Sequence, residues 1–104
     1  MASIHNLPKV VTGQSLETMT YTLSGKDITG ALITFNVKKQ GKLYLQKTVG
    51  NGITIVNGPG GVFTINTFKV YLRHGAYRYT LYIALGGVEK RYDYGIWIIK
   101  SADE

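Results

Sequence analysis

Side chains that could perform acid–base or metal chemistry are few and scattered in this sequence. The two histidines, His5 and His74, are far apart in the chain, and the sequence has no cysteine. A metal or catalytic site needs several His, Cys, Asp or Glu side chains that converge. We therefore expect no metal site, no cofactor and no histidine-based catalysis.

The carboxylates give little more support for an enzyme. A glycosidase-like site needs two carboxyl groups that face one cleft. Of the six acidic residues, Asp103 and Glu104 are at the end of the sequence, where fraying is expected, and only Glu89 with Asp93 is a conceivable pair. Both are interpreted more simply as solvated ends of a strand. The sequence therefore predicts a protein that is not an enzyme.

Two glycine clusters raise the question of a phosphate-binding loop. They are Gly50-Asn51-Gly52 and Gly58-Pro59-Gly60-Gly61. A phosphate loop needs a following helix and a Lys-Ser/Thr pair that meets the phosphates. Here each cluster runs into a strand-like pattern, so we expect two tight turns.

Aromatic and cationic side chains form the most informative group. Tyr44, Tyr82 and Trp97 are expected on the face opposite the core, with Arg73 and Arg78 among them. Aromatic rings flanked by cations bind single-stranded nucleic acid, and similar residues form protein interfaces. Exposed aromatics also suit a carbohydrate-binding module for host adhesion. These three classes stay open, but no recognised nucleic-acid motif is present, and protein docking is favoured.

The charge is strongly asymmetric. The chain has 12 Lys and Arg against 6 Asp and Glu, a formal net charge of +6, and no acidic residue between Asp27 and Glu89. Most cations of this stretch fall at predicted turns and strand ends. Such a surface is typical of solvated sheet edges and steers the protein towards an acidic partner.

The elements that position these residues are predicted to be strands. Apolar residues alternate with polar ones almost everywhere, most clearly at Ala31, Ile33, Phe35 and Val37. The predicted strands cover residues 18–23, 31–38, 43–49, 53–56, 62–66, 76–85, 88–94 and 96–99. This spacing favours a sandwich or small barrel of one domain over residues 1–104.

Three segments are less regular. The first ten residues are expected to form an arm or an edge strand. Residues 67–74 are expected to cross between two sheets. Gly95 is expected to mark a bulge, or a position where another backbone segment approaches closely, before Ile96–Ile99. The longest aliphatic or aromatic run, Ile96 to Ile99, is too short for a spanning helix, and the N-terminus does not resemble a signal peptide, so we expect no membrane association.

Four stretches together resemble a known family. They are Asp27-Ile28-Thr29-Gly30-Ala31 with the strand that follows, the pair Gly52-Ile53-Thr54-Ile55 and Gly61-Val62-Phe63-Thr64, the corner Leu72 to Leu81, and Tyr94-Gly95-Ile96-Trp97-Ile98. In order and spacing they are similar to the immunoglobulin-like N-terminal domain of tailed-phage baseplate upper proteins and to related small phage virion domains. The resemblance covers residues 12 to 99.

The resemblance implies an all-β fold, an immunoglobulin-like antiparallel β-sandwich of seven or eight strands. It implies a non-enzymatic structural component of a tailed-phage virion, as a head decoration, tail or baseplate subunit assembled in the host cytoplasm. Other virion proteins with an acidic surface are the expected partners, and a second copy of the chain is an alternative. At the corner, Gly75 permits a sharp reversal and Tyr77 is expected to hydrogen-bond the backbone.

Overall fold

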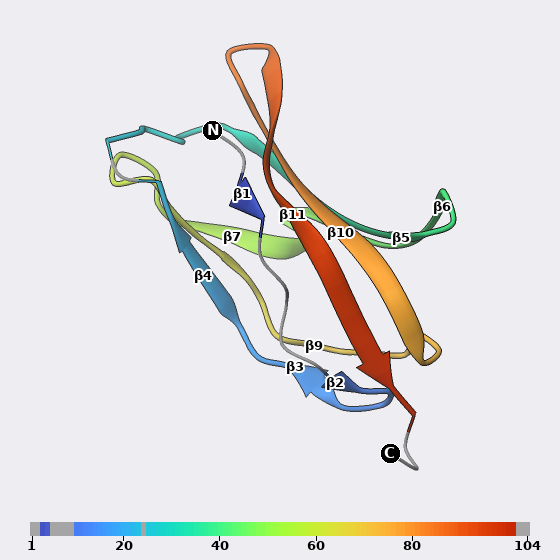
Figure 1. Cartoon of the computed structure of the whole chain (residues 1–104). Coiled ribbons are helices and arrows are strands. Elements are labelled where there is room, and N and C mark those ends of the chain that lie inside the picture. The colour runs from blue at the N-terminus through green and yellow to red at the C-terminus, as the bar shows by residue number, and fades with distance from the viewer. Residues whose placement is uncertain (1–2, 5–9, 24, 102–104) are drawn as a thin grey trace.

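The chain folds entirely into strands and connections over the residues that the computed structural model describes, which are 3–4, 10–23 and 25–101. The predicted all-β class is confirmed (Figure 1). The strands are β1 (Ser3–Ile4), β2 (Val10–Val11), β3 (Ser15–Leu16), β4 (Met19–Thr22), β5 (Leu32–Lys39), β6 (Lys42–Val49), β7 (Gly52–Asn57), β8 (Val62–Ile65), β9 (Phe68–Lys69), β10 (Gly75–Leu85) and β11 (Val88–Lys100).

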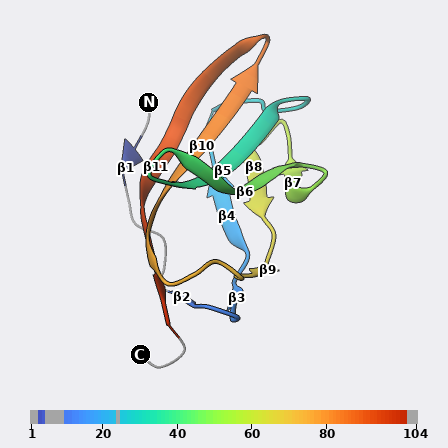
Figure 2. The same ribbon diagram turned by 90° about the vertical axis from the view of Figure 1, so that its right-hand side faces the viewer.

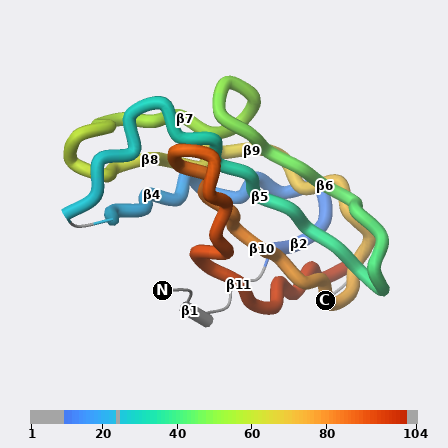
Figure 3. The backbone as a smooth tube through the Cα atoms, turned by 90° about the horizontal axis from the view of Figure 1, so that it is seen from above, coloured from blue at the N-terminus to red at the C-terminus, as the bar shows by residue number. Residues whose placement is uncertain are grey.

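Most of these strands belong to one curled, mixed sheet. Its hydrogen-bonded order is β1-β11-β10-β5-β6-β7-β8-β4, and β2 also pairs with β11. Seen from above, β4, β7 and β8 lie across from β10 and β11 (Figure 3). Because the two ends of the sheet face each other, a single sheet encloses the core.

The N-terminal segment supplies two short edge strands. Ser3 and Ile4 pair in parallel with Asp93 and Tyr94, and Val10–Val11 pairs in parallel with Ile99–Lys100. The backbone of β11 would otherwise leave its outer N–H and C=O groups unpaired at these positions. The expectation of an arm or an edge strand is therefore resolved in favour of edge strands for these four residues, while residues 5–9 lie outside the described part.

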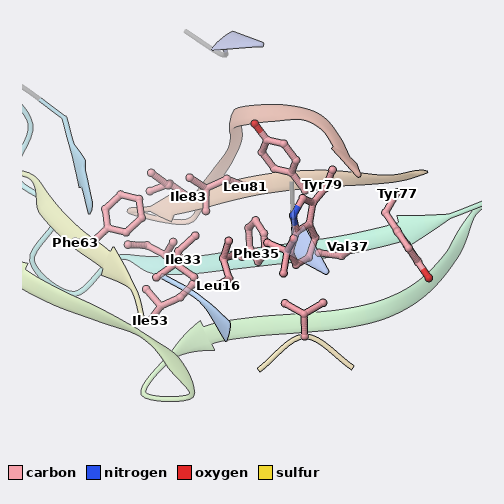
Figure 4. Packing of buried hydrophobic residues seen from close by; sticks show 14 of the residues in the cluster. Leu16, Ile33, Phe35, Val37, Ile53, Phe63, Tyr77, Tyr79, Leu81 and Ile83 are labelled. Carbon is pink, nitrogen blue, oxygen red and sulfur yellow. The ribbon is translucent and has the colours of Figure 1, made fainter. Parts of the chain in front are cut away.

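The core is a continuous cluster of aliphatic and aromatic side chains. The predicted alternation in β5 is confirmed, since Ile33, Phe35 and Val37 are buried. Figure 4 shows these side chains meeting the inward-facing residues of β10, Tyr79, Leu81 and Ile83. Phe63 from β8 stacks against Tyr21 of β4, with ring centroids 5.1 Å apart. Residues from both ends of the sheet thus share one core.

A bulge in β11 decides which of its side chains point inward. Leu81 pairs with Asp93 but Tyr82 pairs with Arg91, so Tyr92 is an extra residue without a partner in β10. Before the bulge the even-numbered Lys90 shares a face with the buried Ile83; after it the odd-numbered Trp97 does so with Tyr77. Of the two alternatives for Gly95, the bulge is wrong, because Gly95 pairs regularly with Tyr79.

The segment between β8 and β10 closes one end of the core. In it, β9 pairs with β3 as a separate two-stranded sheet. The Thr67 hydroxyl donates to the Leu16 carbonyl oxygen at 2.6 Å, and the Val70 N–H donates to the Gln14 carbonyl oxygen at 2.8 Å. This segment therefore passes from one sheet to a second, smaller one.

The predicted turn at residues 58–61 is confirmed and holds the connection between β4 and β5. The Ile28 N–H donates to the Gly58 carbonyl oxygen and the Leu23 N–H to that of Gly61, both at 2.8 Å. Gly61 is buried with φ +72°, and a Cβ there would overlap the Leu23 carbonyl oxygen. A glycine is required at this contact.

Candidate functional site

An apolar depression of about 590 Å³ lies between the β10–β11 hairpin and the β4–β5 connection. We call it the hairpin cavity. Its apolar walls are Leu23, Ile28, Ile83, Leu85 and Val88, and its remaining lining residues are Lys26, Lys90, Arg91 and Tyr92. Cavities of this size, with apolar walls and a few polar groups, are typical of binding sites.

The hairpin forms one wall because it extends past its neighbours. The pairing of β10 with β5 ends at Ala84 and Leu32, whereas β10 and β11 continue to Leu85 and Val88. The hairpin consequently projects beyond the rest of the sheet (Figures 1 and 2). Leu85 and Val88 are 41% and 57% exposed, although the pairing places them on the inward face with Ile83.

The charges around the hairpin cavity are all positive. Lys26 and Lys90 line it, and no carboxylate does. Arg91 also belongs to the lining, but its guanidinium lies on the Tyr94 ring at the other face of the sheet. Asp27 is next to Lys26 in sequence but does not line the cavity; hydrogen bonds from Thr29 engage its carboxylate and lower its pKa below the ordinary value, so it stays ionised. Glu89 pairs with Ala84 on the opposite face of the hairpin. The cavity is therefore suited to an anionic group beside an apolar one.

The outer edge of β11 is open along the same cavity. Within the described residues, β1 and β2 pair with β11 only from Asp93 onwards. No described strand pairs with residues 88–92 on the side away from β10. Four of these residues, Val88, Lys90, Arg91 and Tyr92, also line the hairpin cavity. An unpaired strand edge and an apolar cavity thus lie next to each other.

Tyr82 and Arg78 lie on the other side of the sheet, which we call the outer face. Both occupy positions of β10 that alternate with the buried Tyr79, Leu81 and Ile83. Arg91 pairs with Tyr82, and its guanidinium lies 4.0 Å from the centre of the Tyr94 ring. The outer face therefore joins two of the predicted interface residues with a cation stacked on an aromatic ring.

Tyr44 belongs to a different surface. Its ring meets the ring of Tyr77 edge-on at 5.6 Å, and Lys42 lies 5.5 Å from the Tyr44 ring centre. The Tyr77 hydroxyl donates to the Arg73 carbonyl oxygen at 2.8 Å, which is the backbone contact that the corner motif predicts. Gly75 begins β10 with φ +147°. Tyr44 and Arg73 thus lie near the corner, and the structure does not bring Tyr44 to the outer face with Tyr82.

Trp97 does not lie on the face that the sequence pattern predicts. Its side chain has no exposed surface and packs edge-on against Phe68, with ring centroids 6.3 Å apart. The prediction that Trp97 faces away from the core is wrong, because the bulge at Tyr92 reverses the alternation along β11. Trp97 is part of the core and is not available to a partner of the folded domain.

The prediction that Asp93 lies at a solvated strand end is also wrong, because its side chain is fully buried. Its Oδ1 accepts a hydrogen bond from the Tyr94 N–H at 2.9 Å, and its Oδ2 accepts one from the Tyr21 hydroxyl at 3.3 Å. Burial, together with the Asp93 charge, raises the pKa of Tyr21 and of Tyr79 well above the ordinary value. Both phenols are therefore neutral at physiological pH, and the cluster holds strands together.

Metal-ligating side chains do not gather in the part of the chain that the structure describes. No group of three or more His, Cys, Asp or Glu residues is found there. His74 is exposed before β10, and His5 lies outside the described residues. The described residues also contain no helix long and apolar enough to cross a membrane.

Sequence reasoning missed the hairpin cavity. The available signal was at Leu85 and Val88, which continue the apolar alternation up to Gly86-Gly87, where a solvated hairpin tip would carry polar residues. The β4–β5 wall had no comparable signal, because Leu23 and Ile28 reach the cavity only through the turn at Gly58–Gly61. In comparisons with known proteins, the chain matches no family model and no curated protein.

Proposed function

We propose that this chain is a non-enzymatic docking subunit of a tailed-phage virion, with an immunoglobulin-like β-sandwich fold, and that it binds an acidic surface of another virion protein. The family resemblance of residues 12 to 99 supports the virion setting and the immunoglobulin-like fold. The docking surface is the hairpin cavity and its exposed rim.

The observation that carries this proposal is the combination of exposed apolar groups with positive charge in the lining of the hairpin cavity. Leu85 and Val88 remain exposed beside an apolar cavity, and Lys26 and Lys90 are the cations that line it. Complete burial of an exposed Leu or Val side chain contributes roughly 1.5–3 kcal/mol, and the exposed part of Leu85 and Val88 can contribute about half of that for each. The cations contribute orientation and a faster association with an acidic surface more than affinity.

Incorporation into particles tests the proposal. Phage particles assembled with the Val88→Asp chain should contain much less of it than particles assembled with the wild-type chain, as measured by quantitative mass spectrometry. Val56→Asp is the matched control, because Val56 is 61% exposed on β7 and does not line the cavity. Equal incorporation of wild-type and Val88→Asp chains, or absence of the wild-type chain from particles, would reject the proposal.

A second candidate function is the binding of single-stranded nucleic acid at the outer face. The observation in its favour is the Arg91–Tyr94 stack beside Tyr82 and a shallow depression of about 290 Å³ that Arg78, Arg91 and Tyr94 line. A labelled oligonucleotide should then bind with an affinity that falls steeply with salt and with Tyr94→Ala. No binding near physiological salt excludes this function.

A further inference from the structure

We infer that the occupant of the hairpin cavity is an extended acidic segment of a partner protein, which adds as a strand to residues 88–92 of β11 and places apolar side chains in the cavity. The inference rests on the proposed docking function and names the chemistry of the partner at that surface.

The backbone of β11 supplies the first part of the argument. Residues 88–92 are paired with β10 on one side, and no described strand pairs with them on the other. β1 joins the same edge directly afterwards, at Asp93 and Tyr94, which demonstrates that this edge accepts a strand. An incoming extended segment would continue the sheet and satisfy the exposed backbone groups.

The cavity supplies the second part. In an extended segment every second side chain points to the same face, about 7 Å apart. A volume of about 590 Å³ with walls of Ile28, Ile83 and Val88 accommodates two such side chains. The partner segment is therefore expected to carry an aliphatic and an aromatic residue two positions apart.

Charge supplies the third part. Lys26 approaches the cavity from the β4–β5 connection, and Lys90 approaches it from β11. With cations on two opposite walls, carboxylates on both sides of the apolar pair would each meet a positive group. A basic segment would meet repulsion at the same positions.

An anionic amphiphile shares the charge and the apolar character of this occupant. It lacks amide groups, so it would fill the cavity without pairing with β11. The two occupants are therefore distinguished by the backbone of residues 88–92 and not by the cavity walls.

A titration of the whole isotope-labelled protein tests the inference. The probe is the capped peptide Asp-Glu-Leu-Glu-Phe-Glu-Asp, observed by amide and methyl NMR shifts at low salt. Saturable shifts are expected at residues 88–92 and at Ile28, Ile83 and Leu85, together with slower amide exchange at the β11 edge. Three matched probes follow: the peptide with Lys at every acidic position, the peptide N-methylated at alternate backbone nitrogens, and laurate.

The Lys peptide and the N-methylated peptide should each bind at least about tenfold more weakly, a loss of about 1.4 kcal/mol. Val88→Asp should abolish the shifts, and Val56→Asp should leave them unchanged. The inference is overturned if the acidic peptide gives no saturable shifts up to about 5 mM. It is also overturned if N-methylation has no effect, or if laurate alone occupies the cavity.

Failure here is separable from failure of the docking function. If Val88→Asp blocks incorporation into particles while the peptide does not bind, the surface docks a partner in another way, and only the strand-addition inference is rejected. If the peptide binds but Val88→Asp is incorporated normally, the site exists but does not dock the chain in the virion, and the proposed function is rejected.

Discussion

The hydroxyl of Tyr21 donates a hydrogen bond to Oδ2 of Asp93 at 3.3 Å, and this contact joins opposite ends of the curled sheet. Tyr21 is in β4, the last strand of the sheet order, and Asp93 is in β11, next to the other end. No ladder hydrogen bonds connect these two strands. The side-chain contact therefore stabilises the curl that encloses the core.

Replacement of Tyr21 by Phe should destabilise the protein. The change keeps the ring that stacks on Phe63 and removes the donor to a fully buried carboxylate, at a cost of roughly 1–3 kcal/mol. Urea unfolding measures the loss. Tyr82→Phe on the outer face is the control and should change the free energy of unfolding by much less. Equal effects of the two substitutions would contradict a bracing role for the Tyr21–Asp93 contact.

Stability should fall at alkaline pH. Burial and the Asp93 charge raise the pKa of Tyr21 and Tyr79 in the folded state, so both keep their protons when the unfolded tyrosines ionise near about pH 10. The unfolded state then binds fewer protons, and the stabilisation, complete below about pH 10, is lost as the pH rises beyond it.

Urea unfolding between about pH 8 and pH 11 measures this dependence. The Tyr21→Phe variant has one shifted group fewer and should show a shallower decline than the wild-type protein. Identical slopes for the two proteins would show that Tyr21 does not contribute to the dependence.

Gly61→Ala should be far more damaging than Gly86→Ala. Both residues have positive φ, +72° and +61°, so both substitutions cost about 1 kcal/mol or more of backbone strain. At Gly61 the new Cβ also meets the carbonyl oxygens of Leu23 and Lys26, whereas nothing lies within 4 Å at Gly86. Thermal unfolding of the two variants compares the costs; similar melting temperatures would contradict the close backbone approach at Gly61.

Trp97 should fluoresce as a buried residue. It is the single tryptophan of the chain and has no exposed surface. Its emission is therefore expected to be shifted to the blue of free tryptophan and to resist quenching by iodide, with both properties lost in concentrated urea. Efficient quenching by iodide in the native protein would show that Trp97 is exposed, and Trp97 would again be a candidate interface residue.

The strands that alternate regularly could be predicted from sequence. β5 and β10 pair in register over seven positions from Arg78 and Lys38 to Ala84 and Leu32, and their inward residues are the apolar ones of the pattern. A single sequence records such a pattern because burial of one face requires it at every second residue. The turns at Gly50–Gly52 and Gly58–Gly61 could also be predicted, from their need for positive φ.

The bulge could not be predicted, and most of the errors follow from it. Both Tyr92 and Asp93 fit an ordinary alternating strand, so the sequence carries no mark of the extra residue. The position of the bulge depends on which β10 residue faces each β11 residue, a long-range pairing. Regular alternation along β11 leaves both Trp97 and Asp93 facing solvent, and a bulge at Gly95 would correct the face of Trp97 but not that of Asp93. The parallel pairing of β1 and β2 could not be predicted for a different reason, since two-residue strands have no periodicity.

The bulge at Tyr92 also affects the direction in which the hairpin points without affecting which side chains face the cavity. Removal of Tyr92 alone would leave Arg91 opposite Tyr82 and Asp93 opposite Leu81, so every remaining side chain would keep its face. A bulge bends its strand and increases the local twist. A chain without Tyr92 would therefore present the same cavity wall at a different angle. Deletion of the regularly paired Glu89 would instead move the side chains next to it to the opposite face of the hairpin. A deletion at Tyr92 can therefore change the angle of the projecting hairpin while its other side chains keep their faces.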